Sequence, residues 1–374
     1  MISAVCAVPR GACAPQPRAA KGGAADSDAE DDAVRASDAV FLAGRTEDDF
    51  SCVEMYVYDD EQGSLYVHHD VRLEAFPLAL AFLQHGSAGA RVAVGTMEPR
   101  IDVWDLDVME PAAPVASLGG DAPTAAGRKA PRPTPGAHGD AVLSVSWRRH
   151  SPTVLASGSA DRTVKLWDLN ARACAVTWTH HGADSSVVGR GVDVRGDPSQ
   201  VAWHPAEPAC LATGGHDGRL AVRDARRATA GATFAAGGRV EQVAWDPFVA
   251  TTLVAGDETG GVVAFDVRAA AAPLWSLRAH GAAASAVCFS ETAAGLLATA
   301  SADASVKLWD CGGAPGPPAP VAARDLAVGE LFALAFDAVD PLVLVAAGAG
   351  GSVALWDAAG DDGAAAAWLA AQGK

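Results

Sequence analysis

Two sets of side chains in this sequence combine the residue types of a hydrolase triad with a tryptophan. In both sets the histidine precedes the tryptophan by 29 positions. The sets are His138, Ser157, Asp161 and Trp167, and His280, Thr299, Asp303 and Trp309. A serine activated by histidine and aspartate is a nucleophile for acyl transfer.

A structural role explains the two sets better than catalysis, because they recur at repeat spacing with the hydroxyl inside a strand pattern. We predict a buried chain from indole N–H to hydroxyl, hydroxyl to imidazole, and imidazole to carboxylate. Such a chain gives each buried polar group a partner. The sequence therefore predicts no catalytic residue.

An aromatic residue followed by aspartate closes segment after segment of the chain. These closers are Trp104-Asp105, Trp167-Asp168, Phe265-Asp266, Trp309-Asp310 and Trp356-Asp357, with Arg223-Asp224 as a degenerate sixth. From position 223 onward they are about 42 to 47 residues apart, near the period of a four-stranded propeller blade. Each unit opens with an alternating strand that ends in an aromatic residue or in a His-Pro or Asp-Pro turn, as in residues 201–205 and 243–247.

The N-terminal residues supply a seventh unit, with strands expected at 5–9, 40–43, 53–58 and 65–68. We therefore predict an all-β fold, a seven-bladed WD-repeat β-propeller with four-stranded antiparallel blades in one domain, 1–374. The predicted blades are 1–70 (with an acidic insertion at 11–37), 71–118, 138–181 (after a linker at 111–136), 200–234 (after an insertion at 182–199), 239–278, 280–325 and 330–371. The ring then closes by packing of the first blade on the last or by strand pairing of residues 364–371, and both alternatives stay open.

Three insertions interrupt the period, and insertions in repeat proteins map to loops. In the first, Ser27 lies in an acidic run and is a candidate phosphosite, although a solvated loop without a regulatory role is the favoured interpretation. In the second, the basic cluster of Arg128, Lys129 and Arg132 suits nuclear import or RNA contact, but a plain linker is favoured. The third, 182–199, is a lineage-specific loop or an error in the gene sequence.

Composition limits the classes of function. The chain has 374 residues, 50% of them hydrophobic, and a formal net charge of −17, which argues against non-specific binding of nucleic acid through the whole domain. Seven scattered cysteines suit a reducing compartment. The clustered histidines, His68-His69-Asp70 and His180-His181, lack further ligands at metal spacing, so we predict no metal and no cofactor.

The chain resembles the periodic tryptophan protein 1 family. The resemblance is carried by residues 48–58, 65–70, 76–80, 92–99 and 101–107, and it extends to 1–11, 160–170 and 179–181. It implies a non-enzymatic scaffold in the nucleus and nucleolus that acts in ribosome biogenesis, in assembly of the large-subunit precursor and in rRNA production. The implied partners are proteins of pre-ribosomal particles, with rRNA or chromatin contacted indirectly, and neither a membrane nor a small-molecule substrate.

This sequence departs from the family in its weakly basic loop at 111–136, in Arg223 and in the extra loop at 182–199. The weakly basic loop puts direct RNA contact and import through that loop in doubt. The other two departures bear mainly on blade rigidity.

Two alternative functions stay open. A substrate receptor of a cullin-type ubiquitin ligase is suggested by Asp-x-Arg after an aromatic residue, which Phe265-Asp-Val-Arg268 fits loosely. A chromatin propeller that reads methylated histone tails needs an aromatic cage, for which the tyrosines are Tyr56, Tyr58 and Tyr66. The candidate partner contacts are Arg162, Arg219 and Arg268.

Overall fold

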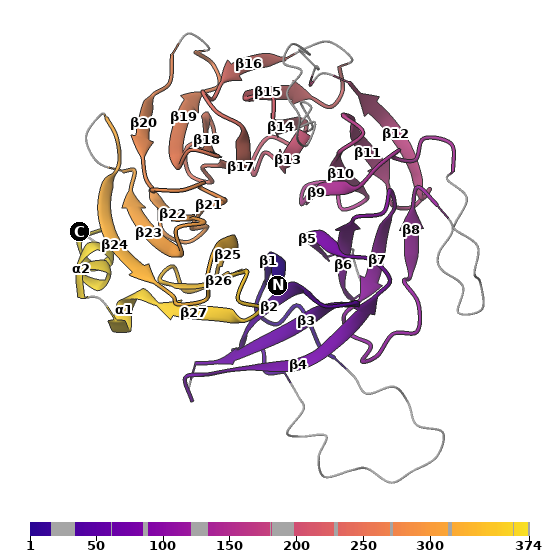
Figure 1. Ribbon diagram of the computed structural model, residues 1–374, viewed down its shortest axis with the longest axis horizontal. Coiled ribbons are helices and arrows are strands. Elements are labelled where there is room, and N and C mark those ends of the chain that lie inside the picture. The colour runs from indigo at the N-terminus through magenta and orange to yellow at the C-terminus, as the bar shows by residue number, and fades with distance from the viewer. Residues whose placement is uncertain are drawn as a thin grey trace.

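The computed structural model is a ring of β-sheets around a central axis (Figure 1). It describes residues 1–15, 34–60, 62–84, 89–120, 134–179, 181, 198–227, 231–269, 272–312, 316–361 and 363–372. Within these residues, 27 strands form seven antiparallel sheets, and each sheet is built from strands consecutive in the chain. The prediction of a seven-bladed WD-repeat propeller is confirmed.

The first three blades have four strands each. Blade 1 contains β1 (Ile2–Val8), β2 (Ala39–Glu47), β3 (Phe50–Asp59) and β4 (Ser64–Leu73). Blade 2 contains β5 (Pro77–Gln84), β6 (Ala90–Thr96), β7 (Ile101–Asp105) and β8 (Ala116–Leu118). Blade 3 contains β9 (Val142–Trp147), β10 (Val154–Ser159), β11 (Val164–Asp168) and β12 (Ala173–Trp178).

Blades 4 to 6 repeat this plan. Blade 4 contains β13 (Pro198–Trp203), β14 (Cys210–Gly215), β15 (Arg219–Asp224) and β16 (Ala232–Ala235). Blade 5 contains β17 (Val240–Trp245), β18 (Thr252–Asp257), β19 (Gly261–Asp266) and β20 (Trp275–Arg278). Blade 6 contains β21 (Ala286–Phe289), β22 (Leu296–Ala300), β23 (Ser305–Asp310) and β24 (Ala319–Asp325).

Blade 7 departs from the predicted plan because its sheet has three strands in the described residues. These are β25 (Leu331–Phe336), β26 (Val343–Gly348) and β27 (Val353–Asp357), followed by α1 (Ala358–Asp361) and α2 (Gly363–Gln372). The segment 364–371, considered as a closing strand, is therefore helical. Four consecutive alanines with Leu369 favour a helix, since alanine has the highest helix propensity.

The core lies between neighbouring blades, where their alternating apolar side chains meet. At the joint of blades 3 and 4, for example, Val164, Leu166 and Trp178 pack with Val201 and Leu211. The innermost strand of each blade is its first, so the seven first strands surround the axis (Figure 1). The ends of these strands and the loops that follow them form one face of the ring.

The ring closes by packing of blade 1 on blade 7. Ile2, Phe41 and Tyr56 of blade 1 share a buried cluster with Val345 and Ala347 of blade 7. The closing joint also contains an ion pair, in which Arg10 Nη2 lies 2.8 Å from Asp337 Oδ2 and Nη1 lies 2.7 Å from Asp60 Oδ2. Side-chain packing, one of the two alternatives the sequence left open, is thus what the structure contains.

The predicted insertions fall mostly outside the described residues. Ser27 and the cluster of Arg128, Lys129 and Arg132 lie there, as do residues 182–197. The stretch expected as a linker, 111–136, contributes strand β8, and β13 begins at Pro198, inside the predicted third insertion. Neither helix of the described chain has the length and apolar character needed to cross a membrane.

Candidate functional site

The four residues predicted as a buried chain in blade 3 lie within hydrogen-bond distance of one another. Trp167 Nε1 donates to Ser157 Oγ at 2.8 Å, and Ser157 Oγ lies 2.7 Å from His138 Nε2. His138 Nδ1 lies 2.9 Å from Asp161 Oδ2. With the carboxylate ionised, Nδ1 donates to Asp161 and Nε2 accepts the hydroxyl proton of Ser157.

The charges in this chain are fixed by burial and hydrogen bonding. Burial lowers the pKa of His138, although the hydrogen bond to Asp161 opposes the shift, so the imidazole is neutral near pH 7. Burial alone would raise the pKa of Asp161, but hydrogen bonds from His138 and Thr163 hold it well below its usual range. Ser157 is fully buried on β10 and accepts the indole N–H, so its hydroxyl does not face a substrate.

Blade 6 repeats this geometry. Trp309 Nε1 donates to Thr299 Oγ1 at 2.9 Å, Thr299 Oγ1 lies 2.8 Å from His280 Nε2, and His280 Nδ1 lies 3.2 Å from Asp303 Oδ2. Burial again lowers the pKa of His280.

A third chain lies in blade 4. The sequence favours one histidine of the pair His180-His181 in the hydrogen-bond network of its blade, but it does not identify the partners. His181 Nε2 lies 2.8 Å from Thr213 Oγ1, and His181 Nδ1 lies 3.2 Å from Asp217 Oδ2. The histidine precedes the hydroxyl residue by 32 positions instead of 19, because the insertion at 182–199 separates them. Alignment of Thr213 with Ser157 and of Asp217 with Asp161 was the signal that could have found it.

The closing residues of the blades have two separate roles. The aromatic members are buried: Trp104, Trp167, Phe265, Trp309 and Trp356. The aspartates that follow them accept the backbone N–H two residues later and so hold the turn after the third strand. This bond is made by Asp105, Asp168, Asp224, Asp266, Asp310 and Asp357.

The histidine and tyrosine clusters do not assemble into sites. His68 Nδ1 and His69 Nδ1 are 2.8 Å apart, and burial, with His68 beside it, lowers the pKa of His69 to about 4. Tyr56 donates to Glu54 at 2.7 Å and packs with Tyr58 against blade 7, whereas Tyr66 is exposed. Within the residues that the structure describes, no group of His, Cys, Asp and Glu is arranged to hold a metal ion.

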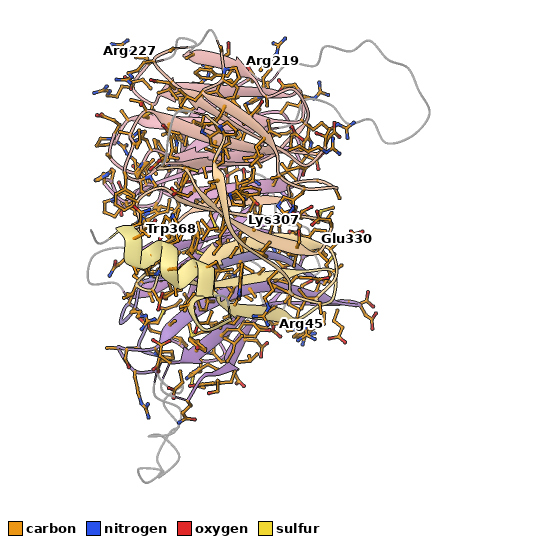
Figure 2. The ribbon with its side chains drawn as sticks, turned by 90° about the vertical axis from the view of Figure 1, so that its left-hand side faces the viewer. Arg45, Arg219, Arg227, Lys307, Glu330 and Trp368 are labelled. Carbon is orange, nitrogen blue, oxygen red and sulfur yellow. The ribbon has the colours of Figure 1, made fainter. Side chains whose placement is uncertain are left out.

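The three arginines proposed as partner contacts are not brought together. Arg162 and Arg219 lie at turns between second and third strands, in blades 3 and 4, while Arg268 follows the third strand of blade 5. Because the strands run antiparallel, Arg268 lies on the face of the ring opposite to Arg162 and Arg219. Figure 2 shows the same separation within blade 4, between Arg219 and Arg227, which follows the third strand of that blade. The Arg268 guanidinium is already paired with Asp266, at 2.8 Å.

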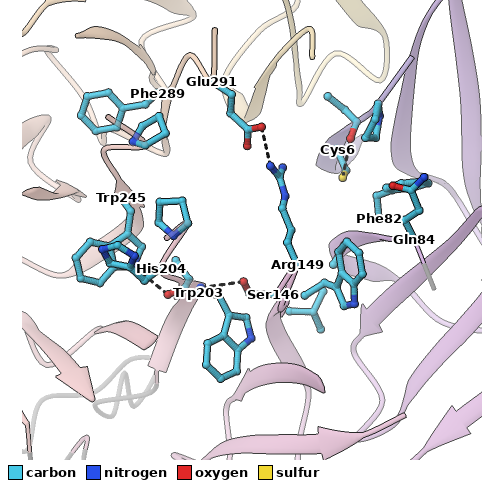
Figure 3. Close-up of a pocket in the computed structure, with 18 of the residues that line it drawn as sticks. Cys6, Phe82, Gln84, Ser146, Arg149, Trp203, His204, Trp245, Phe289 and Glu291 are labelled. Atoms are coloured by element: carbon cyan, nitrogen blue, oxygen red, sulfur yellow. Dashed lines mark hydrogen bonds and ion pairs between the residues drawn. The ribbon is translucent and has the colours of Figure 1, made fainter. Parts of the chain in front are cut away.

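A cavity of about 770 Å³ lies at the centre of the ring (Figure 3). It opens on the face formed by the ends of the first strands. Its walls come from six blades and include five aromatic side chains, Phe82, Trp147, Trp203, Trp245 and Phe289. The aromatic residue that ends a first strand, noted in the sequence as a repeat signature, therefore lines the cavity in blades 3 to 6.

One ion pair crosses the cavity. Arg149 Nη1 of blade 3 lies 2.7 Å from Glu291 Oε2 of blade 6, 142 positions away, and both side chains are more than half exposed (Figure 3). These are the charged residues among the described lining. Sequence reasoning missed this pair because no local pattern links positions so far apart.

The cavity wall is held by the turns that follow the first strands. His204 Nε2 donates to Ala250 O at 2.6 Å, and its Nδ1 accepts the N–H groups of Ala206 and Glu207. The His204 ring lies 4.6 Å from the Trp245 ring. Asp246, Ser290 and Asp337 hold the corresponding turns of blades 5 to 7 by accepting backbone N–H groups. The arrangement offers a preformed recess that combines aromatic side chains with polar ones and contains one solvent-exposed ion pair.

Comparisons with known proteins agree with this architecture. The WD domain, G-beta repeat family matches residues 130–168 and 271–310. The chain is 32% identical to the periodic tryptophan protein 1 homolog of Drosophila melanogaster over 77% of its length and 61% of the relative's. It is 31% identical to periodic tryptophan protein 1 of Saccharomyces cerevisiae over 81% of its length and 60% of the relative's.

A shorter match involves a protein with a stated process in its name. The chain is 31% identical to a ribosome biogenesis protein WDR12 homolog of Chlamydomonas reinhardtii over 23% of its length and 18% of the relative's. The chain thus spans about three fifths of the length of the first two relatives and a small part of the third.

Proposed function

Because this chain is a WD-repeat relative of periodic tryptophan protein 1, we propose that it is a non-enzymatic scaffold in ribosome biogenesis. It acts in assembly of the large-subunit precursor and in rRNA production, in the nucleus and nucleolus. Its partners are proteins of pre-ribosomal particles, and rRNA or chromatin is contacted indirectly. The ribosomal context rests on the family resemblance and on the WDR12 homolog.

The observation that carries the scaffold function is the aromatic cavity at the centre of the ring. Its lining residues project from six blades, whose relative positions are fixed by the buried joints between them. A preformed recess binds a protein segment without a large cost of ordering its own side chains. A charged group of a partner can replace Arg149 or Glu291 in their ion pair, or it can form a further ion pair with one of them.

Affinity capture from nuclear extract tests this function. The tagged full chain should recover large-subunit precursor particles, and Arg149→Glu should recover fewer of them because it places two carboxylates across the cavity. The matched control is Arg226→Glu, whose guanidinium is also exposed but pairs with Asp224 outside the cavity. Failure of the unmodified chain to recover large-subunit precursors or their assembly proteins would contradict the proposed function.

A further inference from the structure

The third strand of blade 7, β27, is the edge of its sheet. In the other six blades a fourth strand runs along the corresponding edge. After Asp357 the chain enters α1, and α2 packs near β24 of blade 6, with Trp368 and Leu369 against the blade 6–blade 7 core (Figures 1 and 2). Within the described residues, nothing continues the sheet of blade 7 beyond β27.

The open edge leaves apolar side chains of β27 partly exposed. Blade 1 closes with Tyr58-Asp59 and blade 4 with Arg223-Asp224. The residue three positions before the closing aromatic or arginine is at most 1% exposed in the six other blades, at Met55, Ile101, Val164, Leu220, Val262 and Val306. Its equivalent in β27, Val353, is only half-buried. Leu355, two positions later, is half-buried as well, although both side chains contact the buried cluster that blades 1 and 7 share. In blade 4 the residue equivalent to Leu355, Val222, is also half-buried. In the other five blades this residue is buried, at Val57, Val103, Leu166, Ala264 and Leu308.

The other blades indicate what covers these positions. In blade 3, Trp178 of the fourth strand lies opposite Val164, and Val176 lies opposite Leu166. Trp178 then fills the joint with blade 4. In blade 4, Phe234 lies opposite Leu220, and in blade 5, Leu277 lies opposite Val262. In blades 2 to 5 the fourth strand therefore places a large apolar side chain opposite the residue equivalent to Val353, whereas blade 1 places His69 there and blade 6 places Arg324. Within the described residues, no fourth strand of blade 7 lies opposite Val353.

The backbone of β27 has hydrogen-bonding groups that face the open edge, as third strands of other blades have groups that face a fourth strand. At the position equivalent to Leu355, the carbonyl of Val103 accepts the N–H of Val115 at 2.8 Å, and that of Ala264 accepts the N–H of Leu274 at 2.7 Å. Alternate residues of a strand turn their N–H and C=O groups to the same side. Val353 and Leu355 thus turn theirs outward, where an added strand forms main-chain hydrogen bonds.

Carboxylates lie near the C-terminal end of β27. Burial raises the pKa of Tyr58, and the carboxylates of Asp60, Asp357 and Asp340 near it act in the same direction. Asp357 ends β27, and in blade 3 the equivalent Asp168 lies opposite Ala173, the first residue of the fourth strand. An antiparallel strand added to β27 therefore has its N-terminal end beside the carboxylates of Asp357 and Asp340, whereas Asp60 is already paired with Arg10.

We propose that the outer edge of β27 binds an extended segment of a partner protein. The segment carries large apolar side chains at alternate positions and a basic residue at its N-terminal end. It pairs antiparallel with β27, and its apolar side chains cover the parts of Val353 and Leu355 that blade 1 leaves exposed. This site is separate from the central cavity and does not depend on a ribosomal partner.

A peptide with the sequence of this chain's own residues 172–179 is a suitable probe, because it begins with Arg172 and contains Val176 and Trp178 at alternate positions. Cys174→Ser in the peptide prevents oxidation. Fluorescence anisotropy with the full chain should give saturable binding. A control peptide with Val176→Ser and Trp178→Ser should bind at least about tenfold more weakly, since it lacks both of the large apolar side chains that the edge would bury.

Hydrogen exchange locates the bound peptide. The amides of Val353 and Leu355 should gain protection, and those of Val164 and Leu166 in the peptide's parent blade should not change. Absence of saturable binding, equal binding of the control peptide, or protection in blade 3 alone would overturn the proposal.

A matched pair of protein variants completes the test. Val353→Ser should abolish binding of the probe peptide, whereas Val339→Ser, at a position 54% exposed in the turn before β26, should leave it unchanged. Sedimentation of the same proteins tests a second copy as the occupant. A dimer that disappears in Val353→Ser would assign the edge to self-association and overturn the assignment to a partner protein.

Discussion

Blades 3 and 7 end their third strands with the same Trp-Asp pair, but only blade 3 is complete. Trp167 and Trp356 are both 1% exposed, yet Trp167 donates to Ser157 whereas the Trp356 indole N–H has no partner among the described residues. Blade 3 continues into β12, while blade 7 continues into helices. The closing motif therefore specifies a buried strand and its turn, and the following residues decide whether a fourth strand forms.

The largest effect is expected from loss of the blade 3 tryptophan. Trp167→Ala should lower the free energy of unfolding by about 3–5 kcal/mol, because it leaves a cavity and removes the hydrogen bond that the indole donates to Ser157. Chemical denaturation followed by circular dichroism measures this. Trp356→Ala is the control, since it creates a similar cavity without breaking a hydrogen bond. A smaller loss for Trp167→Ala than for Trp356→Ala would contradict the structural role of the blade 3 chain.

Blade 7 depends instead on the closing joint. Arg10→Ala leaves the Asp337 carboxylate, 1% exposed, without its cation, and should cost about 2–3 kcal/mol. Arg149→Ala breaks a surface pair and should cost at most about 1 kcal/mol. Equal losses in thermal denaturation would show that the Arg10 pair does not hold the ring closed.

A subtler substitution isolates the indole hydrogen bond. Trp167→Phe keeps most of the volume but removes the donor to Ser157, so we expect a loss of about 1–2 kcal/mol beyond that of Trp356→Phe, which removes a donor without a partner. Urea titration of the two variants side by side gives this difference. Identical losses would mean that the hydrogen-bonded chain adds nothing to packing.

The smallest effect is expected from pH. His138 and His280 have lowered pKa values in the folded protein, so the unfolded chain takes up protons first as the pH falls below about 6.5. Their stabilising contribution is present above that pH and is lost as the pH falls toward the folded pKa. Hydrogen exchange, corrected for intrinsic rates, should therefore show blades 3 and 6 losing protection between pH 7 and 5.5 before blade 7. Uniform loss across the ring would contradict this assignment.

The sequence predicted the features that repeat locally. The closers, the strand alternation and the 29-residue spacing sufficed for the seven blades and for the side chains of two buried chains. The chain built on His181 escaped because an insertion altered its spacing, and the Arg149–Glu291 pair escaped because only closure of the ring brings blades 3 and 6 together. The helix at 363–372 was missed because the repeat pattern outweighed the helix propensity of its alanines.

Blades 3 and 7 each contribute a surface that a partner can bind. Blade 3 contributes Trp147 and Arg149 to the cavity, and blade 7 contributes an open strand edge. Cross-linking of the full chain to protein and RNA in growing cells tests the scaffold account most directly. We predict cross-links from the cavity rim to proteins of large-subunit precursors, with few to RNA. Cross-links to RNA alone, or to proteins unrelated to these precursors, would contradict it.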